Sequence, residues 1–229
     1  MTAGSPAADE GVHTSWAHRP AAQAVRNGLL CYVLGPLISY YTHTEVFGLS
    51  HLEGLVPPVV FAANHSSHLD TPIILRALPP EWRRNTAVVA AADYFYRNRL
   101  TAYAVSLAFG TVPIDRTARS SRSATERLHE MLDQPLNILL YPEGTRSRDG
   151  SMGILRSGAG RLATEHRVPI VPISLVGTHE AMPPGILWPR RHPVTLRFGA
   201  PLLPHPGEDH RKMTIRLRVA LAEQRSQDE

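Results

Sequence analysis

The stretch VVFAANHSSHLDTP, Val59 to Pro72, places two histidines and an aspartate between an apolar run and a proline. The apolar run predicts a buried strand over Val59–Ala63, and Pro72 fits the first turn of a helix that follows. The residues from His65 to Asp70 then form a loop at the C-terminal end of the strand. Open α/β sheets bind their ligands at that edge, so the stretch predicts a functional site.

The polar residues of this loop have three interpretations. An aspartate before a helix commonly serves as the helix cap, which is one role for Asp70. Alternatively, the turn brings the Asp70 carboxylate to the imidazole of His65, which fixes the tautomer and leaves the second ring nitrogen as a base. A zinc site built from both histidines and Asp70 is the third, but zinc needs three or four converging ligands and no further histidine lies nearby. We therefore expect no metal, and expect His68 to face solvent or to support the catalytic pair.

The rest of the chain alternates β-rich runs with helical patterns, which is the rhythm of an α/β domain. A chain of 229 residues, 43% of them hydrophobic, is long enough to fold as one such domain. We predict a single α/β domain with a mostly parallel or mixed central sheet flanked by helices and preceded by an apolar N-terminal helix. The predicted strands are Val46–Leu49, Val59–Ala63, Thr86–Ala91, Leu136–Tyr141, Ile170–Leu175 and Val194–Phe198. The predicted helices are Thr71–Leu78, Arg97–Phe109, Ser120–Leu132, Ser157–His166 and Lys212–Gln224, and Ala77–Asn85 and Met182–Pro193 are predicted loops.

The composition limits the chemistry that the chain can carry out. The formal net charge is +4 and Lys212 is the sole lysine, so the basic residues are nearly all arginine. A GC-rich coding sequence explains this without any function, whereas guanidinium groups also suit phosphates and the anionic face of a membrane. Cys31 is the only cysteine, which excludes an intrachain disulfide and a cysteine-based zinc site and fits a reducing compartment.

We divide the chain into a flexible tail at residues 1–20, an apolar helical segment at 21–43 and a folded domain at 44–229. The tail has no apolar period, and no convincing signal peptide follows it. The centre of the second segment is GLLCYVLGPLISYY, Gly28 to Tyr41. It is shorter than the ~20 residues that a membrane-spanning helix needs. It is either a buried helix of the domain or a helix that lies in the membrane interface.

Two later stretches repeat the pattern of an apolar run followed by a polar loop. In LNILLYPEGTRSRDG, Leu136 to Gly150, Gly144 permits a tight turn and Arg146 can present two N–H groups to a phosphate. In GTVPIDRTARS, Gly110 to Ser120, Arg116 follows another apolar run. A solvated surface turn is the alternative for each stretch. No G-x-S-x-G elbow occurs, so the commonest serine-hydrolase signature is absent.

Together these stretches resemble the glycerolipid acyltransferases of the lysophosphatidic-acid acyltransferase type. NHSSHLD, GTVPIDR, YPEGTRSRDG and VPIVPISLVG are similar to the four sequence blocks of that family and occur in its order. The resemblance implies that His65 is the general base and that Asp70 orients it. The other roles that it implies are acceptor binding by Arg116, Glu143, Gly144, Thr145 and Arg146, and a part for Pro172 in shaping the acyl-donor site. Two residues depart from the family's usual choices: Pro113 replaces a bulky apolar residue and Arg156 replaces a frequent lysine.

The implied function is an O-acyltransferase of phospholipid biosynthesis. It would move a fatty acyl group from acyl-CoA or acyl carrier protein to the hydroxyl of a lysophosphatidate-like acceptor. General-base catalysis by a His–Asp pair needs no covalent acyl-enzyme and no cofactor. The implied partners are membrane phospholipid and the acyl donor rather than nucleic acid, at the cytoplasmic face of the membrane, which favours the interfacial interpretation of the apolar helix. Glycerol-3-phosphate or another lipid acceptor is the alternative within the family, and a metal-dependent hydrolase or a non-catalytic membrane-binding protein is the alternative outside it.

Overall fold

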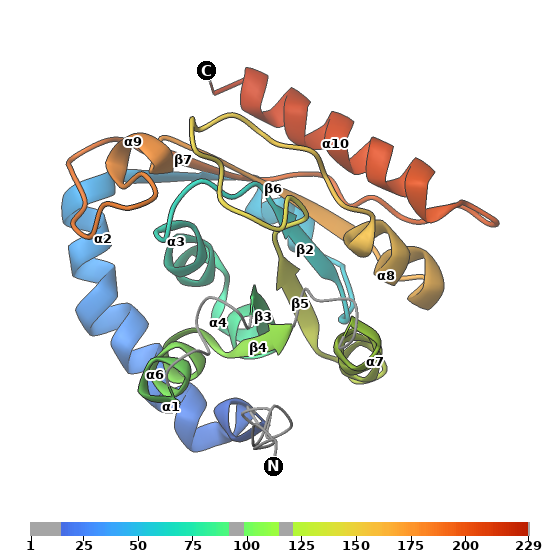
Figure 1. Cartoon of the computed structure of the whole chain (residues 1–229), viewed down its shortest axis with the longest axis horizontal. Coiled ribbons are helices and arrows are strands. Elements are labelled where there is room, and N and C mark those ends of the chain that lie inside the picture. Colours follow the sequence, from blue (N-terminus) through green and yellow to red (C-terminus); the bar gives the residue numbers. More distant parts are fainter. Residues whose placement is uncertain (1–14, 92–98, 115–120, 229) are drawn as a thin grey trace, which may run out of the picture.

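A mixed sheet forms the centre of the computed structural model, which describes residues 15–91, 99–114 and 121–228 (Figure 1). Within these residues seven strands pair in the order β1-β7-β6-β2-β5-β3-β4. Neighbouring strands run parallel except for β6 and β7, which are antiparallel. The strands are β1 (Thr44–Phe47), β2 (Val60–Ala63), β3 (Thr86–Ala91), β4 (Thr111–Ile114), β5 (Asn137–Leu140), β6 (Ile170–Val176) and β7 (Val194–Phe198). The predicted α/β class with a mixed sheet is confirmed.

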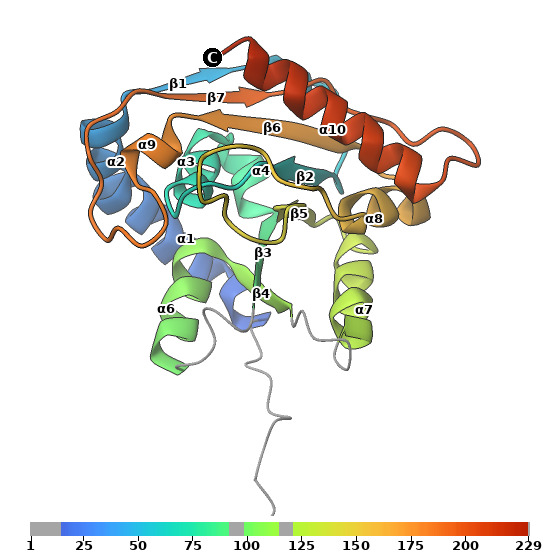
Figure 2. The same ribbon diagram turned by 45° about the horizontal axis from the view of Figure 1, so that its top comes forward.

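Helices cover both faces of this sheet (Figures 1 and 2). One face packs against η2 (Leu29–Leu34), α2 (Gly35–Thr42), α3 (Asp70–Ala77) and α4 (Pro80–Arg84). The other face packs against α7 (Ser121–Leu132), α8 (Gly158–His166) and α10 (His210–Ser226). The remaining described helices are η1 (Ser15–His18), α1 (Pro20–Gly28), η3 (Leu49–Leu52), α6 (Arg99–Phe109) and α9 (Thr178–Ala181).

The central strand β2 shows why the sheet needs two helical layers. All four of its residues are buried. Because side chains alternate along a strand, Phe61 and Ala63 join one hydrophobic cluster, and Val60 and Ala62 join the other. A strand buried on both faces reads as a continuous apolar run, which is the pattern that predicted it.

The N-terminal residues 20–42 form one helical run of three sections, α1, η2 and α2. The middle section is a π-helix that ends directly before Gly35 and Pro36. Leu30 and Ile38 are buried in the core, whereas Tyr32 is 83% exposed. The run is therefore partly a helix of the domain and partly a free apolar surface. Among the described residues, no helix has the length and apolar character required to cross a bilayer.

The structure corrects the sequence prediction at two short elements. Ala77–Asn85 is not a continuous loop, because α4 begins at Pro80, whose fixed φ suits the first turn of a helix, and buries Trp82 against Phe61. Strand β4 was not among the predicted strands. It contains Pro113 and lies at the edge of the sheet, which is where a strand tolerates proline.

Candidate active site

The candidate site lies where the loops after β2 and β5 meet. These two strands are parallel neighbours, so their C-terminal ends reach the same edge of the sheet. The first loop carries His65 and leads into α3 at Asp70, and the second carries Glu143 and Arg146. The backbone N–H of Ser147 donates a hydrogen bond of 2.8 Å to the carbonyl of His65, which joins the loops directly.

His65 and Asp70 form the pair that the sequence predicted. The imidazole Nδ1 lies 2.7 Å from Oδ2 of Asp70, whose side chain is fully buried. A carboxylate can only accept, so Nδ1 carries the proton and Nε2 keeps its lone pair. The same Oδ2 accepts the backbone N–H groups of Ser66 and Ser67 at 2.8 and 2.9 Å. These N–H groups precede the helix, so Asp70 closes the loop rather than capping α3.

Tyr141, the last residue before the second loop, holds the face of the imidazole. Its ring stacks on His65 with a centroid distance of 3.9 Å and an interplanar angle of 18°. Its hydroxyl lies 2.7 Å from Oγ1 of Thr71, in the first turn of α3. Burial, with the negative charge of Asp70, raises the pKa of Tyr141 well above its usual value, so the phenol is neutral.

Glu143 connects the two loops through backbone groups. Its Oε1 accepts the N–H of His65 at 2.8 Å, and its Oε2 accepts the N–H of Gly153 at 2.7 Å. The carboxylate is buried. Its visible contacts therefore position His65, and its implied role in acceptor binding stays a prediction.

Two other residues of the first block hold the loop against the neighbouring strand and the segment beyond it. The side-chain amide of Asn64 donates to the carbonyl of Leu175 at 2.9 Å and accepts its N–H at 2.8 Å. The hydroxyl of Ser67 donates to the carbonyl of Met182 at 2.7 Å. Both side chains are buried, and their hydrogen bonds hold in place the loop that carries His65 and Asp70.

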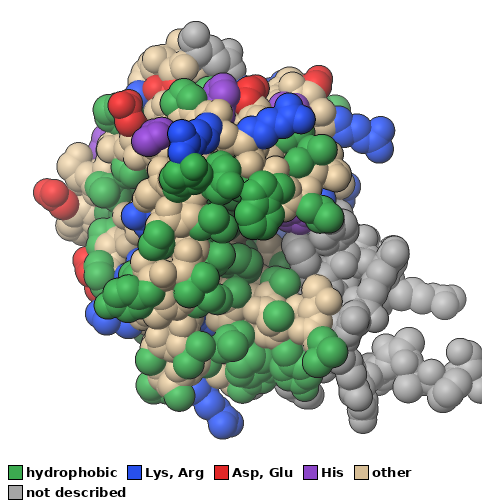
Figure 3. Space-filling model, turned by 90° about the vertical axis from the view of Figure 1, so that its left-hand side faces the viewer, with side chains coloured by type: hydrophobic (Ala, Val, Ile, Leu, Met, Phe, Trp, Pro, Cys, Tyr) green, Lys and Arg blue, Asp and Glu red, His purple; other side chains and the backbone are tan. Residues whose placement is uncertain are grey.

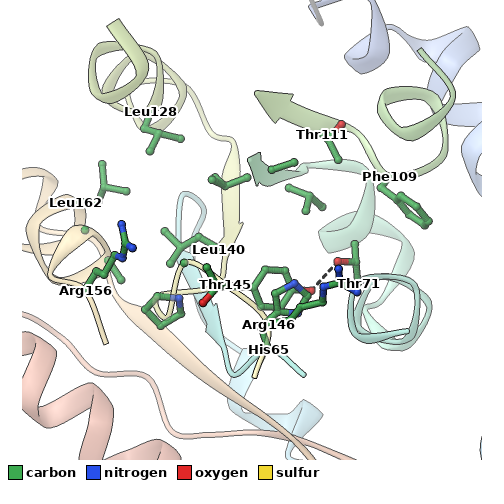
Figure 4. Close-up of a pocket in the computed structure, with 18 of the residues that line it drawn as sticks. His65, Thr71, Phe109, Thr111, Leu128, Leu140, Thr145, Arg146, Arg156 and Leu162 are labelled. Atoms are coloured by element: carbon green, nitrogen blue, oxygen red, sulfur yellow. Dashed lines mark hydrogen bonds between the residues drawn. The ribbon is translucent and has the colours of Figure 1, made fainter. Parts of the chain in front are cut away.

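A cavity of about 750 Å³ opens beside His65 (Figure 4). In the figure His65, Thr71 and Arg146 lie close together, while Leu128 and Leu162 point into the cavity from α7 and α8. Apolar residues line it and are called here the apolar wall: Val88, Val89, Ala90, Val105, Phe109, Leu128, Leu140, Ala159 and Leu162. Four arginines also line it and are called the basic wall: Arg146, Arg148, Arg156 and Arg161. The cavity thus combines room for a hydrocarbon chain with side chains that attract a phosphate.

The residues implied for substrate binding are distributed unevenly around this cavity. Gly144, Thr145 and Arg146 line it. Gly144 has a φ of +76°, and an added Cβ would lie 2.9 Å from Nε of Arg156, so only glycine fits there. Pro172 is buried inside the sheet opposite Ala62 and is not among the described lining residues, so any effect on the donor passes through strand packing. Arg116 lies outside the described residues.

Sequence reasoning overlooked several lining residues. Tyr141 stood in a quoted block but received no role, although its place directly before the polar loop was a usable signal. Arg148 lies in a quoted block and Arg156 was noted as a departure from the family, but neither was assigned to the site, and Arg161 carries no motif that distinguishes it from a solvated arginine.

His68 also lines the cavity. Burial lowers the pKa of its imidazole to about 4, with the positive charge of Arg146 and of a protonated His65 acting in the same direction. His68 is therefore neutral at pH 7. Within the described residues, no group of three His, Cys, Asp or Glu side chains is arranged to hold a metal ion.

These features place the chain in the acyltransferase family, whose family model matches residues 45–176. The chain is 33% identical over 143 residues to the 1-acyl-sn-glycerol-3-phosphate acyltransferase BAT2, chloroplastic, of Brassica napus, which covers 62% of this chain and 40% of that protein. It is 34% identical over 139 residues to the human 1-acyl-sn-glycerol-3-phosphate acyltransferase alpha, covering 58% of this chain and 46% of that protein. The chain thus matches less than half of the length of these relatives.

The fold is also found in a solved structure. The 1-acyl-sn-glycerophosphate acyltransferase PlsC of Thermotoga maritima superposes with a TM-score of 0.69 over 89% of this chain and 76% of that one, at 20% sequence identity. The family resemblance drawn from the four sequence blocks is confirmed.

Proposed function

We propose that this protein is an O-acyltransferase that transfers a fatty acyl group from an acyl thioester to the hydroxyl of a lysophosphatidate-like acceptor. The observation that carries the proposal is the His65–Asp70 pair beside a cavity with one apolar and one basic wall. The family membership and the names of the relatives support the same reaction. The donor is acyl-CoA or acyl carrier protein.

In the proposed reaction, Nε2 of His65 removes the proton of the acceptor hydroxyl as the oxygen attacks the thioester carbonyl carbon. The tetrahedral intermediate collapses with cleavage of the C–S bond, and the imidazolium returns the proton to the departing thiolate. The products are an ester and a free thiol. The Asp70 carboxylate stabilises the imidazolium in the transition state, and a positioned base of this kind contributes ~10²–10⁴-fold to the rate.

The arginines of the basic wall bind the acceptor's phosphate in this proposal. Arg146 adjoins Ser147, whose N–H bonds to the carbonyl of His65, and Arg156 packs against Gly144 of the same loop. A guanidinium group can offer two parallel N–H donors to a phosphate, which orients as well as attracts it. Fixing the phosphate places the hydroxyl beside the base, and such positioning lowers the barrier further.

The acceptor and product both carry fatty chains, so we place the protein on the cytoplasmic face of a membrane. In this proposal the segment 21–43 is the membrane-associated helix that precedes the acyltransferase domain. The exposed apolar side chains of α1, η2 and α2 support the assignment.

The test is thiol release from palmitoyl-CoA and from palmitoyl-acyl carrier protein, with and without lysophosphatidate. We expect release that requires the acceptor and that falls by ~10²–10⁴-fold in His65→Ala and Asp70→Asn. His205→Ala, at an exposed histidine away from the cavity, is the matched control, and circular dichroism checks that each variant is folded. Near-normal release by folded His65→Ala would refute the base assignment.

The acceptor dependence of the same assay separates the remaining alternatives. Thiol release with glycerol-3-phosphate but not with lysophosphatidate would identify glycerol-3-phosphate as the acceptor. Release without any acceptor would identify a thioesterase instead of a transferase.

A further inference from the structure

The loop between α9 and β7, residues 182–193, exposes apolar side chains that no part of the proposed mechanism uses. Leu187 is 93% exposed and Trp188 is 65% exposed, and Ile186 beside them is also exposed. Large apolar side chains gathered at one place on a surface commonly mark a contact with a membrane or a protein. The loop therefore needs a partner.

The same side of the molecule carries the free surface of the N-terminal helical run (Figure 3). Its exposed apolar residues are spread over all three sections of the run, α1, η2 and α2. They are Val25, Tyr32, Val33, Leu37 and Tyr40. We call these five residues, together with Ile186, Leu187 and Trp188, the docking face.

The two halves of the docking face are held together by direct contacts. The indole N–H of Trp188 donates to the hydroxyl of Tyr41 at 3.0 Å, and the N–H of His192 donates to the carbonyl of Tyr41 at 2.9 Å. The guanidinium of Arg191 lies 4.0 Å from the ring centroid of Tyr40. The loop and α2 thus form one surface.

The charges around the docking face suit an anionic surface. Residues 20–43 and 182–193 contain no Asp or Glu, while Arg190 and Arg191 directly follow the apolar tip of the loop. Tyrosine and tryptophan beside arginine is the composition of segments that lie at the headgroup level of a bilayer. A second copy of the chain fits less well, because a two-fold contact through this face would bring these arginines near their own copies.

The loop is also continuous with the active site. Pro184 lines the cavity beside His65, three residues before Leu187. The carbonyl of Met182 accepts the hydrogen bond of Ser67 from the loop that carries the catalytic pair. The tip of the loop is therefore joined by a short stretch of chain to a residue that lines the cavity.

We infer that the docking face binds the surface of an anionic phospholipid bilayer, and that the loop 182–193 is a second membrane contact beside the N-terminal helix. The apolar tip enters the interface while Arg190 and Arg191 bind lipid phosphates. The inference rests on the proposed function for its lipid acceptor, but membrane binding itself does not require turnover.

The experiment is cosedimentation of the whole protein with vesicles of phosphatidylcholine, and with vesicles of phosphatidylcholine and phosphatidylglycerol. We expect the parent protein to bind the anionic vesicles more tightly than the others. The double variant Arg190→Ala with Arg191→Ala should bind the anionic vesicles more weakly, by a factor on the order of ten. Leu187→Ser with Trp188→Ser should weaken binding to both kinds of vesicle. The matched controls are Arg218→Ala and Ile215→Ser, at exposed positions on α10, which should bind as the parent does.

Fluorescence identifies the residue that enters the membrane. The emission of the parent should shift to the blue on addition of anionic vesicles, and Trp188→Phe should remove that shift while the two other tryptophans remain. Equal binding by the Leu187/Trp188 variant and the Ile215 control would overturn the inference. A vesicle-free dimer that Trp188→Ser dissociates would also overturn it and assign the face to a second copy.

Turnover distinguishes a failure of this inference from a failure of the proposed function. With lysophosphatidate in detergent micelles, the Leu187/Trp188 variant should acylate as the parent does, whereas with the acceptor in vesicles it should be slower. If no form of the protein acylates either acceptor, the proposed function fails, and the vesicle-binding results still decide the docking face.

Discussion

The stacked rings of Tyr141 and His65 restrict rotation of the imidazole about its Cβ–Cγ bond. Rotation of the imidazole would break its 2.7 Å hydrogen bond to Asp70, and the tyrosine ring 3.9 Å away blocks that rotation from one side. The tyrosine is itself anchored, because its hydroxyl bonds to Thr71 at the start of α3. Tyr141 thus holds the imidazole of His65, which lines the cavity, in the orientation that bonds Asp70.

Replacing Tyr141 with Leu should lower kcat by roughly ten- to a hundredfold with little change in the KM for the acyl donor, because the base loses its orientation. Tyr141→Phe keeps the ring and loses only the hydrogen bond to Thr71, so it should stay within a few-fold of the parent. Steady-state kinetics of both variants checks this. Equal activities for the Leu and Phe variants would show that the stacked ring has no positioning role.

The loops after β2 and β5 act as one unit because Glu143 bonds to both of them. One oxygen receives the N–H of His65, 78 residues away in the chain, and the other receives the N–H of Gly153. The carbonyl of His65 is held by Ser147 of the same loop. Both backbone groups of His65 are therefore fixed by the loop after β5.

Glu143→Gln should lower the free energy of unfolding by about 1–3 kcal/mol, because the new NH₂ group faces a buried N–H donor and leaves it unsatisfied. It should also lower kcat, since His65 loses part of its backbone support. Urea unfolding and thiol release measure the two effects. Glu223→Gln, at an exposed position of α10, is the control and should change neither. A fully stable and active Glu143→Gln would contradict the bridging role.

The free energy of unfolding of the domain should depend on pH because His68 is neutral in the folded protein. The pKa of His68 is lowered to about 4 in the folded protein, while an unfolded histidine titrates near its ordinary value of 6.5. Between these pH values the unfolded chain binds more protons than the folded protein. The contribution of His68 therefore lowers the free energy of unfolding as the pH falls from about 6.5 towards 4. Above that window it has no such effect.

We expect His68→Gln to gain in unfolding free energy relative to the parent as the pH is lowered through this window. Urea unfolding at a series of pH values measures the difference between the two proteins. His43→Gln, at an exposed histidine, serves for comparison. A difference that stays constant with pH would show that His68 titrates alike in both states.

Local patterns were sufficient for most of the elements. Each of the six predicted strands is present with ends shifted by at most two residues, because apolar runs bounded by polar turns report burial directly. The short elements β4 and α4 were not predicted, since proline in a four-residue strand and in a five-residue helix gives an ambiguous signal. The His65–Asp70 pair could be predicted because one short loop joins the two residues.

The contacts that complete the site were decided by the tertiary structure. Tyr141 and Glu143 reach His65 only because β5 pairs with β2, and strand order does not follow from sequence order. The cavity and the docking face likewise join segments far apart in the chain, and the short-range preferences that shape a helix or turn carry no information about such pairs. The sequence therefore predicted the His65–Asp70 pair and the family of the chain, and the packing of the sheet created the surroundings in which that pair is held.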